Sequence, residues 1–268
     1  KSLCIYMETQ GLGGYFIKGK NRIGLVLGVK GVYLYALPKS SSKLERNMFM
    51  EYEKPLITVG IFTYNKFDYL QQTINSVFIQ DYPNIEIILS DDASSNYDLN
   101  YIKKITSNAP SNIKNLQIIH NEKNIGTVKS LNNCIRSSNG DFIIGLGSDD
   151  VFYETTTISK IVDFFLQNNA LIVTAKRLVY DQNMKKKIAV LPTDSDIRYL
   201  LEAQDFLFER LCISNFISGA CTYYSKKLFD KYGLFDEDYI LLEDYPLYLR
   251  LARRNETIHF FNEITVKY

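Results

Sequence analysis

Two adjacent carboxylates, Asp149 and Asp150, end an apolar run and are the clearest chemical signal in the chain. The run at 142–147 is bounded by glycine, which predicts a strand buried on both faces, as in a parallel sheet covered by helices. Carboxylates at the carboxyl end of such a strand lie where open α/β sheets bind ligands. Because neighbouring like charges repel, the pair indicates a cation partner, and a divalent metal carrying a nucleotide diphosphate is one such cation.

The same Ser-Asp-Asp sequence at 148–150 also fits an acidic loop that caps the following helix. A second acidic pair favours a ligand-binding site over a helix cap. Asp91 and Asp92 follow another predicted strand, at 85–89, and polar residues also follow the strands at 55–62 and 116–119. Because the carboxyl ends of parallel strands meet at one edge of a sheet, these clusters are expected to converge there.

The elements that must position these residues alternate between strand and helix. Apolar residues at helical spacing follow the first and third strands, a polar helix to about Ser107 is expected after the second, and Asn65 is expected to cap the first helix. This alternation predicts a parallel sheet with right-handed crossovers and helices on both faces, a three-layer α/β/α architecture. After Asp150 the pattern loosens, and the expected elements are a helix at 155–167, strands at 171–175 and 217–224, helices at 202–210 and 226–231, and a last helix entered through 241–246.

Composition excludes several classes of protein. The chain has 268 residues with a net charge of +1, so no global field indicates nucleic acid as a partner. The four cysteines form no C-x-x-C pair and two histidines cannot build a multi-histidine metal site, which argues against zinc and fits reduced thiols in a cytoplasmic protein. No apolar stretch approaches 18 residues, so no membrane span is expected, and no signal peptide is evident.

Residues 1–54 are expected to form an extension outside the catalytic fold. The segment 23–37 contains β-prone residues interrupted by glycine and could form a hairpin. The glycine-rich stretch at 11–14 lacks the Walker spacing, so a phosphate loop is rejected.

Five short motifs occur in order along the rest of the chain. They are Tyr-Asn at 64–65, Asp-Asp-x-Ser at 91–94, Asn-x-Gly at 124–126, Gly-Asp-Phe-Ile leading to Ser-Asp-Asp at 140–150, and Glu-Asp at 243–244. Together they resemble the family-2, A-fold nucleotide-sugar glycosyltransferases, in particular bacterial enzymes that build surface polysaccharide. The resemblance covers 55–268 and implies a nucleotide-sugar half at 55–154 and an acceptor half at 155–268.

The resemblance also implies roles for individual residues. The backbone around Phe62, Thr63, Tyr64 and Asn65 would hold the nucleotide base together with the Asp92 carboxylate, which accepts the imide N–H of uracil. Asp91 is its neighbour, and Lys129 is a looser match for a contact with the base or the phosphates. Asp149 would contact the ribose or the metal, and Asp150 would ligate Mn²⁺ or Mg²⁺ through oxygen. Asp244 would be the general base, with Glu243 beside it.

These roles suit glycosyl transfer. A metal ion bridging both phosphates offsets the charge that builds on the leaving diphosphate. A carboxylate on the opposite face takes the proton of the acceptor hydroxyl, so the reaction should invert the anomeric centre. The alternative for Glu243 and Asp244 is that they only favour the helix dipole.

The sequence departs from the family pattern in two places. Ser148 stands where the family's Asp-x-Asp has its first carboxylate, so most of the metal role falls on Asp150. A later His or Arg cluster, which in many members contacts the diphosphate or the metal, has no clear counterpart after Asn262. The small residues 218–220 fit either the acceptor side of the site or a packed strand.

Three functions remain in view. The first is an inverting, metal-dependent transferase that uses a UDP-sugar, before other nucleotide sugars, and a saccharide or lipid-linked acceptor. A lipid-linked acceptor would bring the protein to the inner membrane face, where the Lys185–Lys187 run could add weak attraction. The others are a non-catalytic nucleotide-binding module and a sugar nucleotidyltransferase, which would need a glycine-rich basic loop after the first strand.

Overall fold

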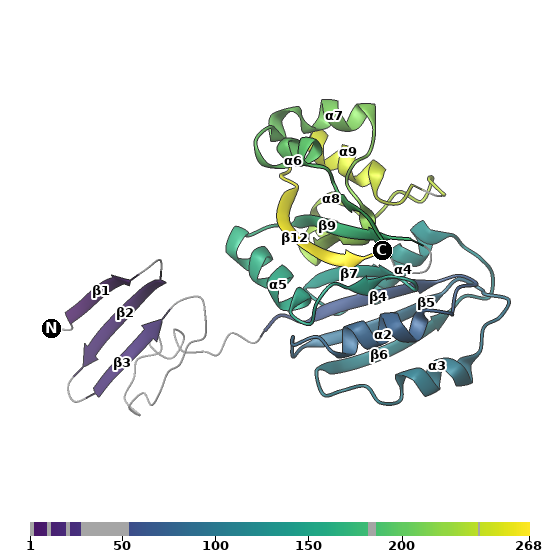
Figure 1. Ribbon diagram of the computed structural model, residues 1–268, viewed down its shortest axis with the longest axis horizontal. Coiled ribbons are helices and arrows are strands. Elements are labelled where there is room, and N and C mark those ends of the chain that lie inside the picture. The colour runs from purple at the N-terminus through teal and green to yellow at the C-terminus, as the bar shows by residue number, and fades with distance from the viewer. Residues whose placement is uncertain (1–2, 10–11, 20–21, 28–53, 182–185, 241) are drawn as a thin grey trace. The chain divides into compact units, whose positions relative to one another are not determined.

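The computed structural model describes residues 3–9, 12–19, 22–27, 54–181, 186–240 and 242–268 (Figure 1). The chain divides into two units, Lys1–Glu53 and Lys54–Tyr268. In the first unit, β2 (Leu12–Gly19) pairs antiparallel with both β1 (Leu3–Thr9) and β3 (Arg22–Leu27). Of the hairpin expected at 23–37, the structure describes only the strand at its start, and residues 28–53 lie outside the described residues. That this unit stands outside the catalytic fold stays a prediction.

The second unit is built on a mixed sheet whose described strands run in the order β6-β5-β4-β7-β11-β9-β12-β8, with β10 paired to β9 (Figure 1). Its strands are β4 (Ile57–Thr63), β5 (Ile85–Asp91), β6 (Ile113–His120), β7 (Phe142–Gly147), β8 (Val151–Phe152), β9 (Ile172–Tyr180), β10 (Lys187–Leu191), β11 (Thr222–Ser225) and β12 (His259–Lys267).

The first four strands form the parallel part of the sheet, as predicted. β4 pairs in parallel with β5 on one side and with β7 on the other, so the strand order reverses between β4 and β7. Open α/β sheets bind ligands beside the carboxyl ends of strands at such a reversal. The register aligns the loops that follow, because Thr63 pairs with Asp91 and Phe62 pairs with Gly147.

Helices cover both faces of this sheet, which confirms the predicted three-layer fold. Alternate residues of β7 separate the two cores, because Ile144 and Leu146 pack with one hydrophobic cluster and Ile143 with the other. The first cluster includes residues of α2 (Leu70–Phe78), α3 (Leu99–Thr106) and α5 (Thr157–Asn168). The second includes residues of α4 (Thr127–Ser137), α6 (Asp194–Leu201), α7 (Leu207–Ile213), α8 (Lys226–Tyr232) and α9 (Tyr245–Arg253).

Two predicted elements in the later half differ from the structure. The strand expected at 217–224 begins only at Thr222, because Gly219–Cys221 form a 3-10 turn. The helix expected at 202–210 is replaced by a 3-10 turn at Gln204–Phe206 followed by α7, and α6 before it was not predicted. These segments are short, so a period of 3.6 residues is hard to detect in them.

Candidate active site

A cavity of about 210 Å³ opens beside the carboxyl ends of β4 and β7, at the strand-order reversal. Its walls come from segments far apart in the sequence, namely β4, α4, β7, the 3-10 turn at Gly219–Cys221 and the residues before α9. Four of the predicted site residues line it together: Phe62, Asp150, Glu243 and Asp244. The structure therefore gathers the proposed metal ligand and the proposed base around one cavity.

The Ser-Asp-Asp segment is a tight turn held against the end of β4. The amide of Ser148 donates to the carbonyl of Phe62 at 3.0 Å, and Ser148 Oγ donates to the carbonyl of Lys66 at 2.9 Å. The Gly147 amide donates to Asp150 Oδ2 at 3.2 Å, and a Cβ at residue 147 would lie 3.0 Å from that same oxygen. The turn leads into β8, while α5 begins only at Thr157, so these carboxylates do not cap a helix.

The acidic pair is buried unevenly. Asp150 is 5% exposed, and burial, followed by repulsion from Asp149, raises its pKa to about 7. The Gly147 amide, Arg177 and Lys66 oppose that rise. Asp149 is more exposed, and its Oδ2 lies 3.1 Å from Lys66 Nζ. Ionisation of Asp150 beside Asp149 is therefore unfavourable in these protein surroundings, and a bound cation would favour it.

This donor set fits a divalent metal carried by a ligand. Among the described residues no cluster of three or more histidine, cysteine or acidic side chains could hold a metal without help. Two neighbouring carboxylates offer the oxygen ligands that hard cations prefer, and Mg²⁺ is usually bound through one or two carboxylates together with substrate phosphates.

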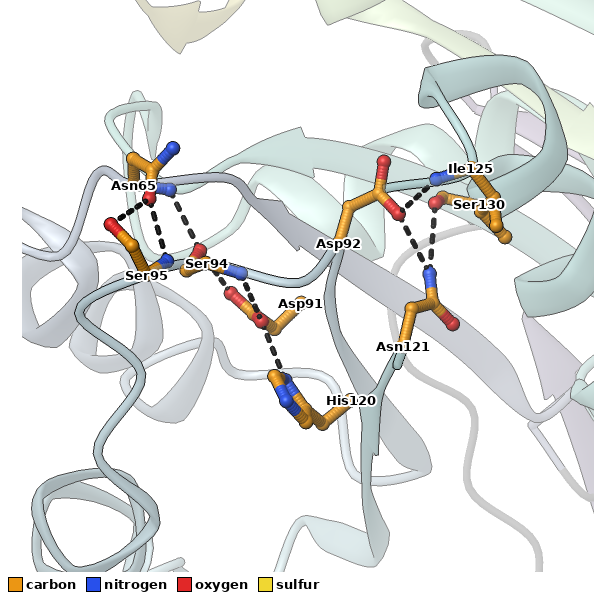
Figure 2. A network of polar contacts seen from close by, with 9 residues as sticks. All are labelled: Asn65, Asp91, Asp92, Ser94, Ser95, His120, Asn121, Ile125 and Ser130. Carbon is orange, nitrogen blue, oxygen red and sulfur yellow. Dashed lines mark hydrogen bonds and ion pairs between the residues drawn. The ribbon is translucent and has the colours of Figure 1, made fainter. Parts of the chain in front are cut away.

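The second acidic pair shapes the loop after β5. Asp91 is fully buried, and its carboxylate accepts from the amide of Ser94 at 3.0 Å and from Ser94 Oγ at 2.5 Å (Figure 2). His120 Nδ1 lies 2.7 Å from Asp91 Oδ2, and the imidazole stacks on Tyr97 with ring centroids 3.9 Å apart. Asp91 therefore holds the loop after β5 in place through Ser94 and His120. Its expected contact with the nucleotide stays a prediction.

Asp92 points toward the start of α4 instead (Figure 2). Its Oδ1 accepts from Asn121 Nδ2 and from the amide of Ile125, and its Oδ2 accepts from the amide of Gly126, each at 2.9 Å. A carboxylate has about four acceptor positions, so three are used and one is left for a ligand such as an imide N–H. The base-binding role of Asp92 stays a prediction that this geometry allows.

Asn65 does not cap the first helix, and that prediction was wrong. Helix α2 begins at Leu70 with Tyr69 at the cap position. Asn65 adopts a left-handed φ of 57°, its amide donates to Ser94 Oγ, and its Oδ1 accepts from the amide of Ser95 (Figure 2). It joins the loops after β4 and β5.

The remaining predicted nucleotide contacts differ in exposure. Thr63 is buried, where its carbonyl accepts from the Asp92 amide, whereas Tyr64 is 52% exposed. Lys129 lies on the exposed side of α4, outside the residues that line the cavity, and its charge helps to lower the pKa of Glu237. Their contacts with a nucleotide stay predictions.

Asp244 occupies the cap position of α9, but its side chain makes no capping hydrogen bond. Burial, followed by the charge of Glu243, raises the pKa of Asp244 to about 6, while backbone amides, including that of Gly219, oppose the rise. A carboxylate with this pKa is ionised near neutral pH and can still accept a proton. The structure thus favours a residue that faces the cavity over one that only favours the helix dipole.

Three residues of the site were not predicted. Lys66 directly follows the Tyr-Asn motif, so its position next to that motif could have marked it. Arg177 lies within β9, where nothing in the apolar pattern distinguishes it. Gly219 was noted only as one of several small residues, and its role depends on a contact with Asp244 that no sequence pattern shows.

The model of the family described as "Glycosyl transferase family 2" matches residues 58–233, most of the chain. The chain belongs to glycosyl transferase family 2. A relative from Rickettsia prowazekii, named "Uncharacterized glycosyltransferase RP339", is 30% identical over 218 residues, which are 80% of this chain and 63% of the relative. The putative glycosyltransferase EpsE of Bacillus subtilis is 28% identical over 139 residues, 52% of this chain and 49% of that protein. The chain therefore spans less than two thirds of these relatives.

Solved structures share the glycosyltransferase fold. TarS 1-349 of S. aureus in complex with UDP matches with a TM-score of 0.59 at 22% identity, over 80% of this chain and 60% of that one. A mannosyltransferase from Pyrobaculum calidifontis in complex with GDP-Man and Mn²⁺ matches with a TM-score of 0.61 at 16% identity, over 80% of this chain and 57% of that one. No helix among the described residues is long and apolar enough to cross a bilayer.

Proposed function

We propose that this family-2 glycosyltransferase chain transfers a sugar from a nucleotide donor, a UDP-sugar before others, to a saccharide or lipid-linked acceptor in surface-polysaccharide synthesis. The observation that carries the proposal is that Asp150 and Asp244, 94 positions apart in the sequence, line one cavity at the strand-order reversal. Solved relatives in complex with UDP, UDP-GlcNAc, and GDP-Man with Mn²⁺ support a nucleotide-sugar donor.

In the proposal, the donor side of the cavity lies at the carboxyl ends of β4 and β7, and the loop that carries Asp92 follows β5, the neighbour of β4 in the sheet. In the proposal, Asp92 uses its remaining acceptor position for the uracil imide, and the backbone from Phe62 to Asn65 supports the base. Asp150 and Asp149 would hold a divalent cation, Mn²⁺ or Mg²⁺, which when bound offsets the charge of the leaving diphosphate. Lys66 beside Asp149 adds a further positive charge on this side.

Asp244 provides the chemistry on the acceptor side. Its carboxylate takes the proton from the acceptor hydroxyl as the glycosidic bond forms, and burial, followed by the charge of Glu243, raises its pKa to about 6, which favours that transfer. Attack from the face opposite the leaving diphosphate gives inversion. Gly219 leaves room next to Asp244 that a side chain would fill.

The experiment is a panel of UDP-sugars and GDP-mannose, each incubated with Mn²⁺ and with saccharide or lipid-linked acceptors, with release of nucleoside diphosphate as the measurement. The proposal predicts release by the native chain that depends on both metal and acceptor, together with loss of release in Asp244→Asn. Nucleotide binding without turnover of any donor would favour a non-catalytic module, and release of pyrophosphate from a sugar phosphate and a nucleoside triphosphate would favour a nucleotidyltransferase.

A further inference from the structure

A cavity of about 580 Å³ opens between helices α7 and α9, which lie side by side (Figure 1). It shares no lining residue with the candidate active site. The residues that line it are two apolar side chains, one thiol and three arginines, namely Phe208, Leu249, Cys212, Arg250, Arg253 and Arg254. No acidic side chain is among them, so three positive charges meet at this cavity without a negative one.

The three arginines have no carboxylate partner. Among the described residues, no carboxylate oxygen lies within 4.0 Å of Arg250, Arg253 or Arg254. The nearest acidic residue along the chain, Glu256, has another partner, because its Oε2 accepts from Lys231 Nζ at 2.8 Å. The positive charge of the cavity is therefore open to a ligand.

Arg250 is the most buried of the three arginines. Its Nη2 donates to the carbonyl of Leu234 at 2.7 Å, and its Nε is shielded from solvent with no acceptor among the described residues. Burial lowers the pKa of Arg250, the charge of Asp236 opposes this, and the charge of Arg254 lowers the pKa further. The charged form is thus unfavourable here, and an anion bound beside it would favour it.

A phosphate group fits this set of donors. Guanidinium groups are planar forks of N–H donors that match phosphate oxygens in pairs, and arginine clusters commonly bind phosphate. Arg253 and Arg254 are exposed, and their side chains make no hydrogen bond within the described part of the chain. Phe208 and Leu249 pack against the second hydrophobic cluster and offer apolar surface to the group that carries the phosphate.

The arginines could serve only the dipole of α9. Arg250 and Arg253 lie in the last turn of this helix, where positive charge is favourable. That role requires neither a cavity nor apolar side chains from a second helix. Phe208 and Cys212 come from α7, so the cavity is a feature of the pair of helices and not of one helix end.

We propose that the cavity between α7 and α9 binds a phosphate ester, whose oxygens accept from Arg253 and Arg254 and whose apolar part packs on Phe208 and Leu249. The proposal goes beyond sugar transfer and does not depend on the identity of the donor or the acceptor. A phosphate on an apolar chain occurs in small phosphate esters and in the head groups of anionic phospholipids, and the experiment separates these two sources.

Cys212 provides a local measurement, because it lines the cavity and is exposed, whereas Cys134 and Cys221 are buried. The rate of its alkylation by iodoacetamide is followed by peptide mass spectrometry, with and without hexyl phosphate. Hexyl phosphate should slow the reaction at least fivefold in the native chain, since the bound ligand covers the thiol. Hexanol, which has the same chain without the phosphate, should change the rate less than twofold.

Arg253→Gln/Arg254→Gln should lose this protection, because it removes the donors and leaves both apolar walls. The matched control is Lys103→Gln/Lys104→Gln, which removes two exposed charges from the last turn of α3 and should keep the protection of the native chain. The protein rates with and without ligand are compared within each variant, so that any effect of the substitutions on the thiol itself cancels.

Vesicle sedimentation identifies the source of the phosphate. If the chain sediments with phosphatidylglycerol vesicles but not with phosphatidylcholine vesicles, and the arginine variant loses this binding, the ligand is a lipid head group. Protection by hexyl phosphate without sedimentation assigns the cavity to a small ester.

The inference is overturned if hexyl phosphate does not protect Cys212 in the native chain, or protects it equally in the arginine variant. Equal protection by hexanol would also overturn it, because the cavity would then bind only the apolar chain. An equal loss in the lysine variant would show that net charge alone acts. Because the measurement is made at Cys212 and not on turnover, each of these outcomes holds whether or not the chain transfers sugar.

Discussion

The backbone of Gly219 lies against the carboxylate of Asp244. A Cβ built on Gly219 would lie 2.8 Å from Asp244 Oδ2, closer than side-chain atoms pack, and the Gly219 amide helps to hold down the pKa of Asp244. The 3-10 turn and the start of α9 are thus fitted to one another around the proposed base. The position of that carboxylate should be sensitive to a single methyl group.

Gly219→Ala should lower the rate of sugar transfer by roughly tenfold to a hundredfold, because the added methyl displaces Asp244 from the acceptor hydroxyl, and small misplacements of a catalytic group cost this much. UDP affinity should stay within twofold, since the proposed function puts the nucleotide beside β4 and β7, away from Gly219. Steady-state kinetics and UDP titration of the same preparation measure both effects.

Gly145→Ala is the matched control for that variant. Gly145 lines the same cavity, but a Cβ there would lie 3.7 Å from Phe62 and 4.0 Å from Leu131, ordinary contact distances. It should therefore transfer sugar at a rate within a few-fold of the native chain. If both variants lose transfer rate equally, any methyl group in the cavity lowers the rate. The effect of Gly219→Ala would then not depend on the displacement of Asp244.

Activity should rise with pH through the titration of Asp244. Its pKa is raised to about 6, and a general base works only when ionised, so kcat/KM should increase from pH 5 and level off above about pH 7. Saturating Mn²⁺ keeps Asp150 ionised during the experiment, so that its own titration does not contribute. A flat profile between pH 5 and pH 8 would argue against Asp244 as the base.

Asp244→Asn should abolish transfer and yet stabilise the fold. The folded-state pKa of about 6 lies above the ordinary 3.8, so the native chain loses stability as pH rises between these values. The loss is complete above pH 6, where removing the charge should recover about 1–3 kcal/mol, at about 1.4 kcal/mol per pKa unit. Denaturant unfolding at pH 4 and pH 7.5 measures it. If Asp244→Asn raises the unfolding free energy by the same amount at pH 4 and at pH 7.5, the gain does not come from removing the charge of Asp244.

Asp91→Asn should disturb the nucleotide loop. Both oxygens of Asp91 accept hydrogen bonds in a fully buried site, and an amide would turn an N–H toward donors. The expected cost is about 1–3 kcal/mol of unfolding free energy, with weaker UDP binding because the loop also carries Asp92. Asp98→Asn on the same segment is the control, since asparagine caps a helix as well as aspartate does. If Asp91→Asn binds UDP as tightly as the native chain does, Asp91 does not position Asp92 for nucleotide binding.

The sequence predicts the parallel half of this fold well because β4 and β7 are largely apolar runs followed by polar residues. It marks only the second half of β6, whose first residues, Ile113–Asn115, include a lysine and an asparagine. The motifs at 148–150 and 243–244 likewise mark residues that line the cavity, namely Asp150, Glu243 and Asp244, since adjacent carboxylates are conspicuous in any sequence. Asn65 shows where local rules fail: it is a good capping residue, but its left-handed backbone joins two loops that only the sheet brings together. Arg177 and Gly219 depend on neighbours distant in sequence, so no spacing predicts them.

The most direct test of the central claim is the affinity of the chain for UDP with and without Mn²⁺, measured by calorimetry for the native chain, Asp150→Asn and the exposed control Asp163→Asn. The account predicts that Mn²⁺ strengthens UDP binding at least tenfold in the native chain and in Asp163→Asn, and that this gain disappears in Asp150→Asn. An equal gain in Asp150→Asn, or no binding of UDP by the native chain in Mn²⁺, would contradict a UDP-sugar site built on the acidic pair.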